Sequence, residues 1–185
     1  MKIILASQSP RRKELLRLLV DDFVIIPADI DETIQPADQP QEYVLKMAQQ
    51  KALAISERYP EDLVIASDTI VANQGKILGK PVSRADAEQM LQAMSGGTHS
   101  VHTAVVLQRG TQKVEQIASA EVTFFELTTQ EINHYLDQNE YQDKAGAYGI
   151  QGAAAVFVKE IKGDYYSIVG FPVGVVNQML KTISF

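Results

Sequence analysis

The chain contains no cysteine. This absence excludes disulfide bonds, thiolate metal sites and a cysteine nucleophile, and it fits a reducing compartment. Long apolar runs are also lacking, since no window reaches the ~18 uninterrupted apolar residues of a membrane span. The apolar start at residues 3–6 is too short for a signal peptide, and arginines follow it directly. We therefore expect a protein with no membrane partner that stays in the cytoplasm, where it is made.

Positive charge is in short supply, because 17 Lys and Arg residues face 23 Asp and Glu residues, for a net charge of -6. Proteins that coat nucleic acid usually show a basic surface, so we expect no nucleic-acid partner. A small polyanionic substrate remains compatible with this charge if a few cations gather locally. The length of 185 residues suits a single domain, residues 1–185, in which two lobes can share one core.

Histidine is scarce as well. His99 and His102 lie three apart on an expected strand, so their side chains face opposite sides, and His134 lies alone on an expected helix. This spacing shows no metal-binding triad.

The apolar pattern predicts the secondary structure. Ser9 as N-cap and Pro10 at the first helical position are typical of a helix start. Further helices are expected at residues 41–58, 83–94, 128–137 and 172–183, and strands at residues 2–6, 23–26, 63–66, 70–72, 98–108 and 117–126. We also expect a hairpin of strands 153–161 and 165–169. These elements predict an α/β fold with a mixed twisted sheet and flanking helices.

A basic turn follows the first strand, in the segment Ser7-Gln8-Ser9-Pro10-Arg11-Arg12-Lys13. Three cations in the first turn of a helix are locally unfavourable, because the helix dipole puts partial positive charge there. An anion bound at the same place would make these cations favourable instead. Hydroxyl groups, free backbone N–H groups and two guanidiniums together indicate a phosphate site, although a solvated basic turn is the plainer alternative.

Carboxylates provide the second signal. Asp68 interrupts an apolar strand within Ser67-Asp68-Thr69, and a buried carboxylate needs a partner, a metal or a solvent-lined cleft. The loop segment Asp29-Ile30-Asp31-Glu32 is acidic, which alone is typical of a solvated surface. Since Mg²⁺ prefers carboxylate ligands, Asp68 and the acidic loop are candidates for one metal site.

Lysines and glycines complete the set of candidates. Lys51 lies late in the expected helix 41–58, and Lys80 lies in Gly79-Lys80-Pro81, which lacks the spacing of a P-loop. Glycines recur every third residue in segment 143–152, Asp143-Lys144-Ala145-Gly146-Ala147-Tyr148-Gly149-Ile150-Gln151-Gly152. Such spacing allows close backbone approach to a ligand or positive φ angles. The segment is a candidate nucleotide-contacting loop, or else an irregular connection.

Together these segments, with Gln50-Lys51-Ala52, resemble the Maf family over essentially the whole chain. Six motifs in the right order are a specific signal. The resemblance implies an elongated, two-lobed fold like that of the inosine triphosphate pyrophosphatases, with a central cleft. It further implies a nucleotide pyrophosphatase that uses a divalent cation, Mg²⁺ or Mn²⁺, and forms a homodimer.

The resemblance also implies roles for individual residues. The glycine-rich segment looks like that of the subgroup acting on dTTP and UTP, whereas the subgroup acting on 7-methyl-GTP typically carries Glu in place of Gln151. Asp68 is expected to be the base or, with Glu32, a metal ligand. Catalytic roles are expected for Asp68, Glu32, Lys51 and Lys80, and substrate contacts for Ser7, Ser9, Arg11, Arg12, Thr69 and Gln151. The alternatives are a pyrophosphatase for 7-methyl-GTP or another modified nucleotide, and a non-catalytic nucleotide-binding regulator of septum formation.

Overall fold

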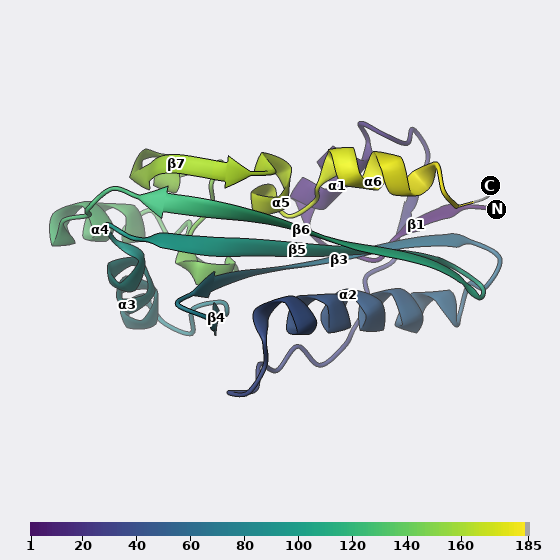
Figure 1. Cartoon of the computed structure of the whole chain (residues 1–185), viewed down its shortest axis with the longest axis horizontal. Coiled ribbons are helices and arrows are strands. Elements are labelled where there is room, and N and C mark those ends of the chain that lie inside the picture. Colours follow the sequence, from purple (N-terminus) through teal and green to yellow (C-terminus); the bar gives the residue numbers. More distant parts are fainter. Residues whose placement is uncertain (184–185) are drawn as a thin grey trace.

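The computed structural model of the chain describes residues 1–183 and shows an elongated molecule built on one twisted sheet (Figure 1). The strands are β1 (Ile3–Leu5), β2 (Val24–Ile25), β3 (Leu63–Asn73), β4 (Lys76–Leu78), β5 (Thr98–Arg109), β6 (Gln112–Phe124) and β7 (Val158–Gly163). The α-helices are α1 (Pro10–Leu16), α2 (Pro40–Ser56), α3 (Arg84–Met94), α4 (Thr129–Leu136), α5 (Tyr165–Val169) and α6 (Val173–Leu180). Two short 3₁₀ helices, Ala145–Ala147 and Ala153–Phe157, follow α4.

The sheet has seven strands in the order β2-β1-β3-β5-β6-β7, with β4 added to the far part of β3. β1 runs parallel to β2 and β3, whereas the pairs from β3 through β7 are antiparallel. The expected α/β fold with a mixed sheet and flanking helices is confirmed. Within residues 1–183 no helix is both long and apolar enough to cross a membrane.

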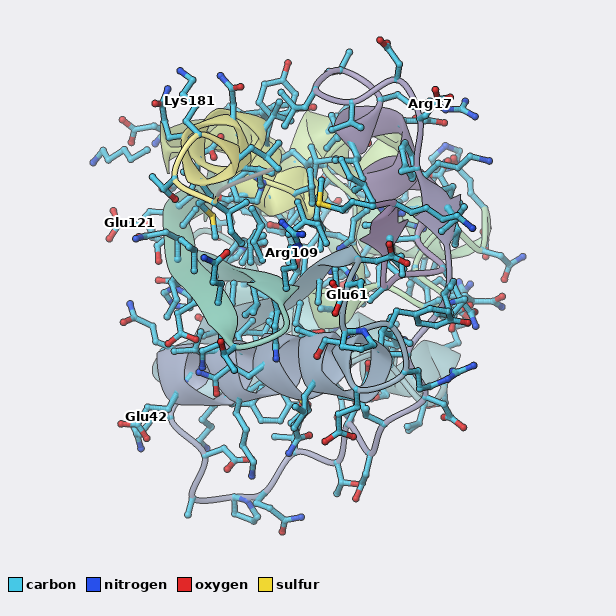
Figure 2. All side chains as sticks on the ribbon, turned by 90° about the vertical axis from the view of Figure 1, so that its right-hand side faces the viewer. Arg17, Glu42, Glu61, Arg109, Glu121 and Lys181 are labelled. Atoms are coloured by element: carbon cyan, nitrogen blue, oxygen red, sulfur yellow. The ribbon has the colours of Figure 1, made fainter. Side chains whose placement is uncertain are left out.

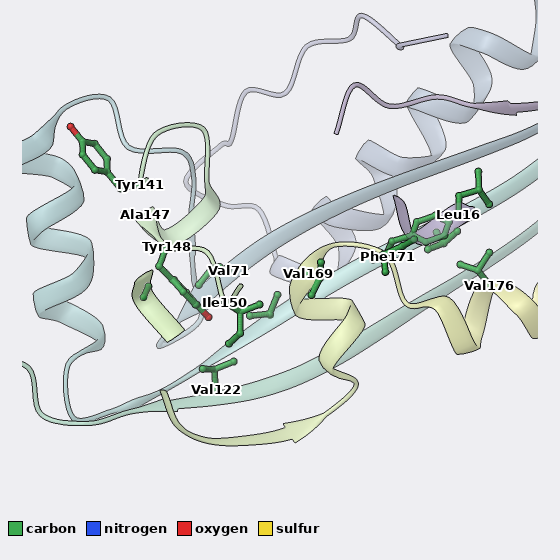
Figure 3. Packing of buried hydrophobic residues seen from close by; sticks show 14 of the residues in the cluster. Leu16, Val71, Val122, Tyr141, Ala147, Tyr148, Ile150, Val169, Phe171 and Val176 are labelled. Atoms are coloured by element: carbon green, nitrogen blue, oxygen red, sulfur yellow. The ribbon is translucent and has the colours of Figure 1, made fainter. Parts of the chain in front are cut away.

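Two hydrophobic cores lie on the two faces of the sheet, as strand alternation requires. On β3, Val64 and Ala66 join the core between the sheet and α2, while Leu63 and Ile65 join the core on the opposite face. The end-on view in Figure 2 shows α2 below the strands and α1 and α6 above them, with charged side chains such as Glu42 and Lys181 directed outward. The second core continues into the region where Val71, Tyr148 and Phe171 lie (Figure 3).

Local capping explains where several helices begin. The Ser9 hydroxyl accepts a hydrogen bond from the Arg12 amide, and Pro10 occupies the first turn of α1 as expected. Thr128 and Glu131 form a reciprocal capping box at the start of α4. These caps confirm the helix starts that the sequence indicates.

The expected hairpin of strands 153–161 and 165–169 is wrong. β7 pairs with β6, not with a following strand, and Tyr165–Val169 forms the short helix α5. Asp164 caps α5 by accepting a hydrogen bond from the Tyr166 amide, and Gly170, at φ +112°, ends it. The β-favouring residues Tyr, Ile and Val therefore yield here to a helix cap and a glycine stop.

Candidate active site

A cleft of about 1160 Å³ opens beside the middle of β3. β3 pairs with β1 only as far as Ile65 and with β4 only from Val71, so one edge of the intervening stretch carries no partner strand among the described residues. Asp68 and Thr69 lie in that stretch. All ten residues for which the sequence predicts a role line this cleft: Ser7, Ser9, Arg11, Arg12, Glu32, Lys51, Asp68, Thr69, Lys80 and Gln151.

The carboxylates of Asp68 and Glu32 meet on the ammonium group of Lys51. Lys51 Nζ lies 2.6 Å from Asp68 Oδ1 and 2.5 Å from Glu32 Oε1. Asp68 belongs to the face of β3 that packs on α2, as do Ala66 and Ile70, which places it opposite a lysine of that helix. The buried carboxylate therefore has the partner that its position in an apolar strand requires.

The electrostatics of Glu32 follow from the same cluster. Partial burial opposes its ionisation, but the hydrogen bond and the charge of Lys51, with the charges of Lys80 and Arg12, outweigh burial. The pKa of Glu32 is therefore lowered. Glu32 thus carries its negative charge inside the cleft, and three cations surround it.

Tyr43 is a residue of this cleft that the sequence reasoning missed. Its hydroxyl donates to the backbone carbonyl of Glu32 at 2.7 Å and so ties the acidic loop to α2. Burial, followed by the charges of Asp68 and Glu32, raises the pKa of Tyr43 to about 12. The signal that could have revealed it is helical spacing, since Tyr43 and Lys51 lie eight residues apart on the same face of α2.

Arg12 is fixed by three hydrogen bonds. Its Nε donates to the Gly170 carbonyl at 2.9 Å, Nη1 to Ser7 Oγ at 3.3 Å, and Nη2 to Thr69 Oγ1 at 3.1 Å. Burial lowers the pKa of the Arg12 guanidinium, and the charge of Asp68 opposes that effect. Arg11 is held less firmly, by one bond of 3.4 Å to the Val169 carbonyl.

A chain of hydroxyl groups leads from Arg12 into the protein. Thr69 and Thr103 are cross-strand partners, and their Oγ1 atoms lie 2.8 Å apart. Thr103 donates to the Ser167 carbonyl at 2.7 Å, so its single proton is used there and Thr69 must donate to Thr103. Thr69 thereby keeps its lone pairs for Arg12. Neither Thr103 nor the turn at Gly170 was expected from the sequence at this site.

The glycine-rich segment forms the opposite side of the cleft. The Gly146 amide donates to the Gly79 carbonyl at 3.1 Å, which joins this segment to the loop carrying Lys80. Gln151 is exposed on the lining. Lys144, a further cation on the lining, donates to the Glu140 carbonyl, and burial, followed by the charge of Arg11, lowers its pKa. Lys144 is visible in the glycine-rich segment of the sequence, but nothing in the sequence pattern indicates a separate role for it.

The donors in this cleft fit a divalent cation of the magnesium type. No cluster of three or more His, Cys, Asp or Glu side chains suited to a metal occurs in residues 1–183. Mg²⁺ is commonly held by one or two carboxylates together with substrate phosphate oxygens and water. Asp68 and Glu32 meet this requirement, since Lys51 brings both carboxylates together beside the cations of the cleft.

Comparison with known proteins gives the same family as the sequence motifs. The family model described as Maf-like protein matches residues 2–183. A dTTP/UTP pyrophosphatase of Latilactobacillus sakei is 48% identical over 178 residues, covering 96% of this chain and 98% of its own length. A dTTP/UTP pyrophosphatase of Bacillus cytotoxicus is 47% identical over 180 residues, covering 97% of this chain and 94% of its own length.

Among solved structures, a HAM1 protein from Coxiella burnetii superposes with a TM-score of 0.54 at 15% identity. The superposition covers 99% of this chain and 100% of that one. At this identity the likeness concerns the fold alone.

Proposed function

The chain belongs to the Maf family, and on that premise we propose that it is a nucleoside triphosphate pyrophosphatase that hydrolyses dTTP and UTP to the monophosphate and pyrophosphate. One observation carries the proposal: two carboxylates that share a lysine, Asp68 and Glu32, line the same cleft as Arg11 and Arg12. Cations alone would suit any phosphate ligand. Carboxylates placed among them suit a reaction with water.

The cations bind and orient the triphosphate. Arg11, Arg12 and Lys80 line the cleft with the hydroxyls of Ser7 and Ser9, and together they offset the charge of the phosphates. The bonds of Arg12 to Gly170, Ser7 and Thr69 hold its guanidinium in place before substrate arrives. Such preorganisation avoids reorganisation during the reaction.

Asp68 serves as the general base. Lys51 engages its Oδ1 atom, which leaves Oδ2 available to orient a water molecule. The water oxygen bonds to the α-phosphorus, its proton passes to Asp68, and the bond from the α-phosphorus to the α–β bridging oxygen breaks. Pyrophosphate leaves with the electron pair of that bond, and the nucleoside monophosphate remains.

Asp68 and Glu32 would also hold the divalent cation, Mg²⁺ or Mn²⁺. When bound, such an ion would supply positive charge that offsets the charge developing on the leaving pyrophosphate. Lys51 keeps the two carboxylates together, so its role is to position them. Replacement of Lys51 would therefore affect both the base and the metal ligand.

Gln151 is proposed to read the base. Uracil and thymine present a carbonyl acceptor beside a ring N–H donor, and a Gln side chain offers the matching donor and acceptor. Its exposed place on the cleft lining leaves it available to a ligand. We further propose that the enzyme works in the cytoplasm as a homodimer, a state that light scattering on the purified chain would measure.

The test is product analysis with purified protein on UTP, dTTP, CTP, GTP and 7-methyl-GTP, with Mg²⁺ or Mn²⁺ added. We expect monophosphate and pyrophosphate as products, with the highest kcat/KM for UTP and dTTP. Asp68→Asn should lower kcat by about 100- to 1000-fold without unfolding the protein. Asp137→Asn is the matched control, because it removes an exposed carboxylate that pairs with Arg84 outside the cleft.

Two outcomes would contradict the proposal. Release of orthophosphate would mean that a different phosphorus is attacked. Tight nucleotide binding without any hydrolysis would favour the non-catalytic regulator instead. A preference for 7-methyl-GTP would keep the reaction and move the chain to another substrate class.

A further inference from the structure

The glycine-rich segment on the base-reading side of the cleft begins with backbone conformations that are intrinsically unfavourable. Gly146 and Ala147 both have positive φ, +67° and +62°, and the second of them carries a side chain. Left-handed backbone is costly for a residue with a Cβ atom, so a segment of this shape needs support from its surroundings. We call residues 146–152 the base loop, since they carry Gln151.

Part of that support comes from bonds to the loop backbone. The Gly146 amide donates to the Gly79 carbonyl at 3.1 Å, and the Tyr135 hydroxyl donates to the Ala147 carbonyl at 3.2 Å. Both bonds hold the first two residues of the loop. The Tyr135 hydroxyl also hydrogen-bonds with the Gly149 backbone, so it supports the loop as far as Gly149.

Tyr148 supplies a second anchor, which connects the loop to the sheet. Its side chain runs from the loop toward the sheet (Figure 3), and its hydroxyl lies 2.7 Å from Nε2 of His99 on β5. Tyr148 is 5% exposed and lines the cleft, whereas His99 is 2% exposed and is not part of the lining. The bond therefore ties the loop to a residue that lies behind the cleft.

The surroundings of His99 show what its polarity is for. Phe124 packs edge-on against His99, at a centroid distance of 4.8 Å, and against Tyr148, at 5.0 Å. His99 Nδ1 is buried and has no hydrogen-bond partner within residues 1–183. A phenyl ring could fill this aromatic pocket without an unpaired nitrogen. The one polar interaction that a histidine makes here, and a phenylalanine could not make, is therefore the bond to Tyr148.

We propose that His99 is a positioning residue for base recognition: by holding the Tyr148 hydroxyl it fixes the base loop, and with it Gln151, in the geometry that selects the base. Tyr148 and Gln151 are separated by only two residues, Gly149 and Ile150, so a displacement of the tyrosine moves the glutamine. The inference rests on the proposed pyrophosphatase function. It adds a residue that does not contact the substrate and yet governs its selection.

A double-mutant cycle tests the bond. His99→Phe and Tyr148→Phe each remove it from one side while keeping an aromatic ring. We expect each to lower kcat/KM for UTP by about 3- to 10-fold, the size of one lost neutral hydrogen bond, through KM and with kcat nearly unchanged. The preference for UTP over GTP should fall by a similar factor. The double variant should be no worse than either single variant, because both remove the same interaction.

Two further variants separate positioning from general packing. His99→Gln retains a group able to pair with the tyrosine hydroxyl and should recover most of the base preference. His102→Phe is the matched control, since His102 lies on the other face of β5 and bonds Ser119 Oγ at 2.7 Å. It should leave the UTP-to-GTP ratio unchanged. If His99→Phe does not fold, Tyr148→Phe alone still tests the bond.

Amide hydrogen exchange gives a readout that does not depend on catalysis. In the absence of nucleotide, amides of residues 147–152 should exchange faster in His99→Phe and Tyr148→Phe than in wild type. Unchanged exchange, multiplying effects in the double variant, or equal loss of activity on UTP and GTP would each overturn the inference. Failure of the wild-type protein to release pyrophosphate would instead refute the proposed function, so the two failures are distinguishable.

Discussion

Arg11 and Arg12 are neighbours in the sequence, yet they make different hydrogen bonds in the structure. Arg12 donates three hydrogen bonds, to Gly170, Ser7 and Thr69, whereas Arg11 makes one longer bond to Val169. Both lie in the first turn of α1, where a cation opposes the helix dipole. The charge conflict is common to both residues, and the structural contribution belongs mainly to Arg12.

Replacing each arginine by alanine should separate these effects. Both variants should lower kcat/KM for UTP, because each removes a cation from the phosphate site. Arg11→Ala should keep its stability or gain about 0.3–1 kcal/mol from relief of the dipole conflict. Arg12→Ala should lose about 1–3 kcal/mol, since it removes the donor to the Thr69 hydroxyl and one of the two donors to the Gly170 carbonyl. Urea denaturation measures both, and equal stability changes would contradict the distinction.

Gln151 is the residue on which base selection is expected to depend. A Glu side chain offers only acceptors when ionised, so it would lose one of two bonds to uracil and repel a carbonyl. Gln151→Glu should therefore cost about 1–3 kcal/mol in kcat/KM for UTP and dTTP. Guanine presents two adjacent N–H donors, so activity on 7-methyl-GTP should rise relative to UTP. The measurement is kcat/KM for all three nucleotides at one metal concentration.

The control for this change is Gln142→Glu, which adds the same charge to the lining of the same cleft. It should lower activity on all three nucleotides by a common factor. If Gln151→Glu behaves in the same way, Gln151 does not read the base and acts only on the loop or the phosphates.

At the scale of elements, the sequence predicts helix bounds well where the capping residues and the apolar periodicity agree. α2 extends over Pro40–Ser56 against the expected 41–58, and Thr128 caps α4 as expected. The sequence does not predict the helix Tyr165–Val169, because its five residues include side chains that favour β-strands. That helix is stabilised by contacts remote in the chain, since Thr103 donates to the Ser167 carbonyl and Ser67 and Arg12 donate to the Gly170 carbonyl. Local propensity carries no information about such partners.

The base loop as an element can be tested at Gly146. This residue has φ +67°, and an added Cβ atom would lie 3.0 Å from Val71 Cγ1. Gly146→Ala should destabilise the protein by about 2–4 kcal/mol, from backbone strain together with overpacking. It should also lower kcat/KM, because Gly146 joins the loop to Gly79. Thermal denaturation and UTP hydrolysis measure the two effects.

Gly75 provides a matched comparison in the turn between β3 and β4. Its φ is +77°, and an added Cβ atom would meet nothing within 4 Å. Gly75→Ala should therefore cost only the strain, about 1 kcal/mol, and leave activity close to wild type. Equal destabilisation of the two variants would mean that the contact with Val71 contributes nothing.

At the scale of the whole molecule, what the sequence could not give is how the motifs meet. Each motif was visible alone, but the cleft exists because β1 ends beside Ile65 and β4 ends beside Val71, which leaves the Asp68–Thr69 stretch of β3 open on one edge. The pairing of Asp68 and Glu32 through Lys51 also depends on α2 crossing that face of the sheet. The strand order and the packing of α2 across the sheet are tertiary properties, so periodicity and motif spacing in the sequence do not predict them.

Global stability should depend on pH through His99, which is buried in the core. Burial lowers the pKa of His99 to about 4, whereas in the unfolded chain a histidine titrates near pH 6.5. Between these values the unfolded chain binds a proton that the native protein does not, so the free energy of unfolding must fall as pH decreases. From about pH 7 to about pH 5 this contribution amounts to roughly 2 kcal/mol.

His99→Phe removes this titration, so the variant should lose about 2 kcal/mol less stability than wild type over the same pH range. Urea denaturation at several pH values measures the difference, and comparison of the two proteins cancels the groups that they share. His102, whose pKa burial also lowers, is one of those shared groups. Parallel pH profiles for the two proteins would contradict the prediction, because they would mean that the pKa of His99 is the same in the native and unfolded states.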